Sequence, residues 1–190
     1  MTTTRDQIIE TTCDLLEAQG YHATGLNQIV KESGAPKGSL YYYFPDGKEG
    51  LTVEAIERQG KLVSDRITQG LAEDDNTANA IRVFIKAIAH NVEASGFRAG
   101  GPLTTVALET ATSSERLNQT CRDAYQLIQT AFAERLIAGG YTKKRAAQLA
   151  TFITAAIEGG IILSRTQHSG DPLQRVAEEV GRLLQADQPA

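Results

Sequence analysis

The chain is short of cysteine, histidine and proline, and each shortage excludes a class of protein. Its 190 residues include two cysteines, too few for the disulfide framework of a small secreted domain. The three histidines are scattered without the His-x-x-x-His spacing of a zinc site, and we expect neither a metal nor a cofactor. Five prolines, with apolar residues at helical rather than alternating spacing, leave little room for β structure. These shortages favour an all-α protein of the reducing cytoplasm.

The sequence also lacks the motifs of common enzyme classes. Serine, histidine and aspartate are present, but no Gly-x-Ser-x-Gly elbow and no phosphate-binding loop occurs. His90 with Glu93 or Glu109 is a conceivable metal pair, but a solvated helix face explains these residues better. Cys13 and Cys121 lie on helix stripes and are interpreted as small hydrophobic residues. We therefore predict that the chain is not an enzyme.

An excess of positive charge is missing too. The formal net charge is −4 at pH 7, and residues 1–50 carry four lysines and arginines against seven aspartates and glutamates. This balance excludes a protein that coats nucleic acid by bulk attraction. The Met-Thr-Thr-Thr start leads into a helix signal without an apolar targeting stretch, so we expect a cytoplasmic location. If the chain binds DNA, local geometry must supply what the overall charge does not.

Hydrophobic periodicity predicts about nine helices and neither strands nor internal repeats. Thr4 and Gln7 form a capping box at the first helix start, and Gly20 suits the left-handed position that ends this helix. Gly34 permits a sharp reversal between two short helices, and a Pro-Asp-Gly break at 45–47 precedes a long one. The expected helices begin near Thr4, Thr24, Pro36, Asp46, Asn76, Leu103, Ser113 or Ser114, Thr142 and Asp171.

Residues 24–48 carry the pattern of a helix-turn-helix. Two short helices flank a tight turn at 33–35, and the second of them can enter a major groove. Lys37 lies at its start, Gly38 removes side-chain bulk, and Ser39 offers a small donor and acceptor. Three tyrosines follow at 41–43, and because successive helical residues point about 100° apart, at least one must face outward, toward phosphate or sugar. The alternative, a helical protein-interaction or ligand-binding module without operator binding, predicts no salt-sensitive DNA affinity.

Residues 1–50 resemble the DNA-binding domain of TetR-type repressors. The resemblance rests on Gly20-Tyr21, Thr24, Ile29, the run Gly-Ala-Pro-Lys-Gly-Ser-Leu-Tyr at 34–41, Phe44 and Lys48. It implies that Leu40 and Phe44 are core residues, and that Tyr43 replaces a histidine common in the family. It also implies double-stranded operator DNA as the partner, contacted mainly through its backbone. The expected DNA contacts are Thr24, Lys37, Gly38, Ser39, Tyr41, Tyr42, Tyr43 and Lys48.

Further segments resemble one branch of this family, the lincomycin-resistance and flavonoid-responsive regulators of LmrA/YxaF type. They are the insertion at 45–49 and the Gly-Gly-Pro-Leu and Ala-Leu-Glu motifs at 100–103 and 107–109. Gly101 stands where that branch usually has cysteine. The resemblance implies a homodimeric repressor that a small-molecule effector releases from a palindromic operator. We expect a helix-turn-helix domain at 1–50 and a helical effector-binding and dimerisation domain at 51–190.

The second domain supplies apolar residues for a sensor pocket. Position and family resemblance select ten candidates, although each one alone is also an ordinary core residue. A mostly apolar pocket with few polar anchors suits a hydrophobic or aromatic effector. The candidates are Phe84, Ile88, Phe97, Pro102, Leu103, Val106, Tyr125, Ile128, Phe132 and Phe152.

The helix expected at 142–166 is apolar almost all round. Between Phe152 and Leu163 its only charge is Glu158, so this helix needs burial on two sides. A membrane span is the rival interpretation, which two threonines and a Gly-Gly pair within the helix disfavour. We expect one face on the domain core and the other against a second subunit, in a four-helix bundle that includes the last helix. The expected interface residues are Ile157, Gly160, Ile161, Val176, Val180 and Leu184.

Overall fold

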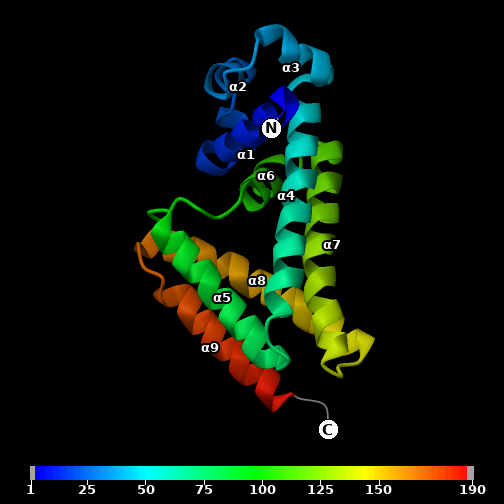
Figure 1. Ribbon diagram of the computed structural model, residues 1–190, viewed down its shortest axis with the longest axis vertical. Coiled ribbons are helices and arrows are strands. Elements are labelled where there is room, and N and C mark those ends of the chain that lie inside the picture. The colour runs from blue at the N-terminus through cyan, green and yellow to red at the C-terminus, as the bar shows by residue number, and fades with distance from the viewer. Residues whose placement is uncertain (1–2, 188–190) are drawn as a thin grey trace. The chain divides into compact units, whose positions relative to one another are not determined.

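The computed structural model describes residues 3–187, which fold into helices joined by short connections (Figure 1). This part of the chain contains nine α-helices and no strand, so the all-α prediction of about nine helices is confirmed. The helices are α1 (Thr4–Ala23), α2 (Leu26–Ser33), α3 (Lys37–Tyr43), α4 (Gly47–Leu71), α5 (Thr77–Ala94), α6 (Pro102–Thr110), α7 (Glu115–Ala138), α8 (Lys143–Gln167) and α9 (Asp171–Ala186).

Local signals in the sequence explain several of the helix ends. Asn76 and Thr142 cap α5 and α8 by accepting a backbone N–H three residues ahead, as predicted. The capping box of α1 lies one residue earlier than predicted, because Thr3 and Asp6 form it. The aspartate carboxylate reaches back to the N–H of Thr3 and fulfils the role expected of the glutamine that follows it.

The chain divides into two compact units. The first unit comprises the residues up to Lys61 together with Gly101–Tyr125, and the second comprises Leu62–Gly100 together with the residues from Gln126 onward. Helices α4 and α7 therefore each contribute to both units, while α6 belongs wholly to the first.

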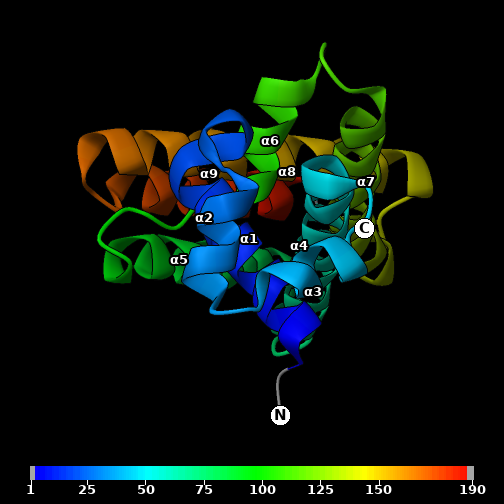
Figure 2. The same ribbon diagram turned by 90° about the horizontal axis from the view of Figure 1, so that it is seen from above.

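In the first unit α1 packs against α2, α3 and α6, and Figure 2 shows α2 and α3 beside it. The reversal between α2 and α3 depends on Gly34, whose φ of 66° places it in the left-handed region that favours glycine. Leu40 and Phe44 are almost completely buried, which confirms their expected place in the core. The largest buried side chains of this unit also include Ile8, Leu16, Ile29, Leu51 and Ile56.

In the second unit α5, α8 and α9 pack side by side (Figure 1). The amphipathic α5 buries Ile81 and Ile85, as its apolar stripe predicts. Helices α8 and α9 approach closely at Gly160, where an added Cβ would lie 2.8 Å from Cδ2 of Leu173. The hydroxyl of Tyr141 donates a 2.8 Å hydrogen bond to the carbonyl oxygen of Leu184 and ties the start of α8 to the end of α9.

Candidate functional site

Helix α3 exposes three tyrosine side chains on one side and buries Leu40 on the other. Leu40 is fully buried, whereas Tyr41, Tyr42 and Tyr43 are 50%, 79% and 38% exposed. The helical spacing required at least one outward tyrosine, and all three face outward. The rings of Tyr42 and Tyr43 meet edge to face with 5.1 Å between their centres, which restricts their rotamers. The phenols are thus held at the surface, free to donate to an acceptor outside the chain.

The first turn of α3 is open to solvent. Lys37 and Gly38 are exposed, and Ser39 is half-buried. A Cβ built on Gly38 would meet no atom within 4 Å. Packing within the chain therefore does not require glycine at position 38. The absence of a side chain lets a bound partner approach the backbone closely.

Two expected DNA contacts lie deeper than the sequence suggested. The side chain of Thr24 is buried, and its hydroxyl donates a 2.6 Å hydrogen bond to the carbonyl oxygen of Gly20. This bond fixes the turn that leads from α1 into α2. The Nζ of Lys48 lies 3.5 Å from the carbonyl oxygen of His22 and 4.2 Å from the centre of the Tyr21 ring. Both side chains are oriented by the end of α1.

Arginines offset part of the negative charge of residues 1–50. Arg58 on α4 binds Asp6 at 2.9 Å and Glu10 at 2.8 Å, and Arg116 on α7 binds Asp46 at 2.9 Å. Three of the seven acidic side chains are thereby paired with cations from outside the segment. A count over residues 1–50 missed these partners because both arginines come from later helices.

The ten effector candidates are distributed over both units. The first unit holds Pro102, Leu103, Val106 and Tyr125, and the second holds the other six. Within the second unit Phe84 and Phe132 meet edge to face at 6.1 Å, and Phe97 meets His168 at 5.4 Å. Most of the candidates are buried or half-buried, as a pocket lining or a core requires. Phe152 departs from this, because its side chain is half exposed on α8.

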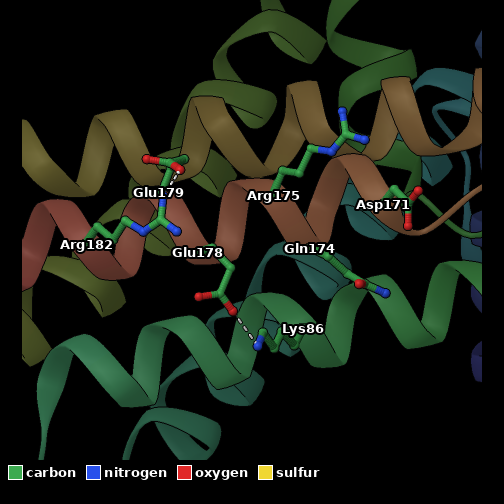
Figure 3. Close-up of a pocket in the computed structure, with 7 residues that line it drawn as sticks. All are labelled: Lys86, Asp171, Gln174, Arg175, Glu178, Glu179 and Arg182. Atoms are coloured by element: carbon green, nitrogen blue, oxygen red, sulfur yellow. Dashed lines mark hydrogen bonds and ion pairs between the residues drawn. The ribbon is translucent and has the colours of Figure 1, made fainter.

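A surface groove of about 440 Å³ lies between α5 and α9 (Figure 3). Its lining is polar, and none of the ten effector candidates belongs to it. Lys86 pairs with Glu178 at 2.5 Å, and Arg182 pairs with Glu179 at 2.6 Å. Two ion pairs thus form along the groove, which lacks the apolar lining that a hydrophobic effector needs. The lining residues are Lys86, Asp171, Gln174, Arg175, Glu178, Glu179 and Arg182.

The fold tests whether the candidate metal ligands share a site and whether the thiols are reactive. Among residues 3–187 no group of three or more histidine, cysteine, aspartate and glutamate side chains is placed to hold a metal ion. Glu93 instead accepts the backbone N–H of Gly170 at 3.0 Å. Burial raises the pKa of the Cys13 and Cys121 thiols to about 11, so neither is a reactive thiolate near neutral pH.

The residues expected at the dimer interface lie mostly inside the second unit. Ile157, Gly160, Val180 and Leu184 are buried there, while Ile161 and Val176 are half-buried. The large apolar side chains that α8 exposes are Phe152, Ile162 and Leu163, each about half accessible. Because α8 is apolar almost all round, its sequence did not distinguish these three positions from the buried ones.

Helix α8 also meets the length and composition of a membrane span. It is the one helix of the described residues that does so, and 39% of its most apolar window is buried inside the chain. The buried share packs against α5 and α9. A soluble core helix with one uncovered side passes the same test.

The sequence matches two families over adjacent segments. Residues 8–55 match the family described as "Bacterial regulatory proteins, tetR family", and residues 77–179 match "Transcriptional regulator LmrA/YxaF-like, C-terminal domain". The first segment contains the helix-turn-helix, and the second contains α5 to most of α9.

Relatives extend over nearly the whole chain. The HTH-type transcriptional regulator YxaF of Bacillus subtilis is 44% identical over 95% of this chain and 94% of its own length. The regulator LmrA of the same organism is 37% identical over 95% of this chain and 96% of its length. Among solved structures, Escherichia coli NemR in its reduced form has the same fold, with a TM-score of 0.84 at 21% identity, over 99% of this chain and 100% of that one.

Motif, fold and relatives lead to one assignment. Regulators of the TetR family bind operator DNA as dimers, respond to small-molecule effectors and are not enzymes. The exposed α3 agrees with DNA binding, and the two family matches cover both the helix-turn-helix and the C-terminal helices. The chain therefore belongs to the TetR family of DNA-binding transcriptional regulators, in the branch with an LmrA/YxaF-like C-terminal domain.

Proposed function

We propose that the chain is a homodimeric repressor that leaves a palindromic operator when a small hydrophobic or aromatic effector binds. In this proposal residues 1–50 bind DNA, residues 51–190 bind the effector and form the dimer, and both act in the cytoplasm. The observation that carries it is the contrast within α3 between the buried Leu40 and the exposed tyrosines that follow. A recognition helix needs one apolar face packed on its own domain and one polar face exposed to the DNA groove.

The proposed DNA surface is the exposed side of α3 and the start of α4. Lys37 supplies a cation at the first turn, Gly38 leaves open space beside it, and the phenols donate to phosphate oxygens. Lys48 adds a second cation at the start of α4. Thr24 takes part indirectly, because its buried hydroxyl fixes the turn that positions α2.

The proposed dimer interface is the exposed stripe of α8. Phe152, Ile162 and Leu163 offer apolar area there, and a Cβ built on Gly159 would meet no atom within 4 Å. This open position lets a second helix approach closely. A second copy of the chain offers the same stripe, so an isologous pair covers both. A second copy of the chain on this stripe agrees with the dimers that the family forms, whereas a lipid bilayer does not.

The DNA proposal is tested with duplexes that the wild-type protein enriches from a random-sequence pool. We expect a sequence with two-fold symmetry, because an isologous dimer presents two copies of α3. Replacing Lys37 with Ala should lower the slope of log affinity against log salt by about one unit. Lys61→Ala, which removes an exposed lysine from the same unit, is the matched control and should leave the slope unchanged. An enriched pool without symmetry, or equal slopes for both variants, contradicts the proposal.

The effector proposal is tested by ligand linkage. A thermal-shift screen of lipophilic and aromatic compounds identifies a ligand, because binding to the native state raises the melting temperature. Calorimetry with and without the enriched duplex should then show a loss of ligand affinity of about 100-fold, or about 2.7 kcal/mol. Equal ligand affinities in the two titrations contradict release by an effector.

A further inference from the structure

Helix α6 is attached to α1 at both of its ends. At its start, Oε1 of Glu17 accepts the backbone N–H of Gly101 at 2.8 Å. Near its end, Oε2 of Glu109 accepts the backbone N–H of His22 at 2.8 Å. The carbonyl oxygen of Glu109 also lies 3.3 Å from Nε2 of His22. All four residues belong to the first unit, so α6 is held by the same helix that supports α2 and α3.

The carboxylate of Glu109 lies against Gly20, where the chain has no side chain. Gly20 interrupts α1 with a φ of 81°, a conformation that residues with a Cβ rarely adopt. A Cβ at Gly20 would lie 2.0 Å from Oε1 of Glu109. Glycine is therefore favoured here by its conformation, and any side chain would displace the Glu109 carboxylate from its present position. The carboxylate sits directly against the turn between α1 and α2.

The same turn orients Lys48. The N–H of His22 points to Glu109, its carbonyl oxygen lies 3.5 Å from Nζ of Lys48, and the preceding ring of Tyr21 lies under that ammonium. Burial lowers the pKa of Lys48, and the Glu109 carboxylate opposes this shift. One carbonyl contact uses one of three ammonium donors, which leaves the others for phosphate oxygens.

We infer that Glu109 is a positioning residue for DNA binding, which acts by holding the Tyr21–His22 segment that orients the Lys48 ammonium. This inference rests on the proposed phosphate contact of Lys48. It places a determinant of DNA affinity 61 residues after Lys48 in the sequence, on a helix outside the helix-turn-helix. Because α6 also carries the effector candidates Leu103 and Val106, a ligand that displaces α6 would act on Lys48 through Glu109.

A double-mutant cycle on the full-length protein tests whether Glu109 acts through Lys48. The probe is the duplex that the wild type enriches from a random pool. Lys48→Ala should weaken binding about tenfold, the effect of losing one charged hydrogen bond, and lower the salt slope by about one unit. Glu109→Ala should weaken binding by a similar factor in the wild type and by less than about twofold when Lys48 is already Ala.

Two further variants separate the hydrogen bond from other effects. Glu109→Gln keeps an oxygen acceptor for His22 and should restore wild-type affinity to within about twofold, since a neutral acceptor suffices to hold the turn. Glu17→Ala removes the hydrogen bond at the opposite end of α6, so its effect should add to that of Lys48→Ala. If Glu109→Ala does not fold, as judged by circular dichroism, Glu109→Asp replaces it in the cycle, because the shorter chain cannot reach the His22 N–H.

The outcomes are distinguishable. Additive effects of Glu109→Ala and Lys48→Ala would overturn the inference and leave Glu109 as a general support of the fold. A Gln variant as weak as the Ala variant would also overturn it, because charge alone would then explain the loss. If Lys48→Ala leaves affinity and salt slope unchanged, the proposed phosphate contact itself fails. If Lys48→Ala weakens binding while Glu109→Ala does not, only the inference fails.

Discussion

Helices α3 and α8 both expose large side chains, but of different chemistry. The exposed groups of α3 are phenols that can form hydrogen bonds, above a fully buried Leu40. Those of α8 are Phe152, Ile162 and Leu163, which have no polar atoms to offer. A wet, charged partner such as a DNA backbone suits the first surface, and a dry self-complementary contact suits the second. Exposure alone therefore does not identify the partner of a surface. The polarity of the exposed side-chain atoms decides which partner the surface can bind.

The sharpest test of this comparison places a charge on each side of the α8–α9 pair. Val180 is 2% exposed, so Val180→Glu buries an unpaired carboxylate and should lower the free energy of unfolding by about 3–5 kcal/mol. Leu163 is 50% exposed, so Leu163→Glu should keep the helical content and produce monomers. Urea denaturation and sedimentation velocity measure the two effects. A Leu163→Glu variant that stays dimeric would place the interface elsewhere.

A second pair tests the two sides of α3. Leu40→Ala removes a fully buried side chain and should cost about 2–5 kcal/mol of stability. Tyr42→Ala removes a 79% exposed ring and should change stability by less than about 0.5 kcal/mol while weakening DNA binding. Thermal unfolding and fluorescence anisotropy on the enriched duplex measure the two effects. Unchanged DNA affinity in Tyr42→Ala would remove this phenol from the interface.

Two adjacent glycines sharpen the comparison within α8. Gly160→Ala would bring a Cβ to 2.8 Å from the buried Leu173 and should lower stability by about 1 kcal/mol, after the better helix propensity of alanine is included. Gly159→Ala meets open space and should raise the stability of the monomer by up to about 1 kcal/mol. If Gly159 lies at a close helix crossing, the same variant weakens the dimer in dilution experiments. Equal effects on stability would contradict the packing described for Gly160.

The last test concerns the buried thiols, whose effect on stability is confined to alkaline pH. The pKa of Cys13 and Cys121 is raised by burial from 9.0 to about 11 in the folded chain. The unfolded chain loses these protons first, so the stabilising contribution is complete below pH 9 and disappears as the pH rises through 11. Stability should therefore fall more steeply between pH 9 and 11 in the wild type than in Cys13→Ser. Parallel pH profiles of the two proteins would contradict a buried Cys13 thiol.

Hydrophobic periodicity and turn-forming residues predicted most of the fold from the sequence. The helices begin near the predicted residues because capping groups such as Asn76 and Thr142 act within a few residues of themselves. Leu40 and Phe44 were expected in the core and are buried. The run from Gly34 to Tyr41, together with Gly20-Tyr21, Thr24, Phe44 and Lys48, resembled the family pattern closely enough to identify the family.

The DNA-binding and dimer-interface residues were harder to predict from the sequence than the helices. Thr24 was expected at the DNA but is buried, and its partner Gly20 is known only from the fold. Val180 and Leu184 lie on the apolar stripe of α9, but the stripe does not say whether it faces its own chain or another. The tie between Glu109 and His22 joins residues 87 positions apart, which no local pattern can indicate.

The sequence by itself determined the helices, the turn at Gly34 and the family, because these depend on neighbours within a few residues and on a compact motif. Only the tertiary structure decided which apolar stripe stays uncovered on α8 and which arginines offset the acidic residues near the helix-turn-helix. It also decided which carboxylate holds the end of α1. These contacts join segments far apart in the chain, and their geometry exists only once the helices have packed.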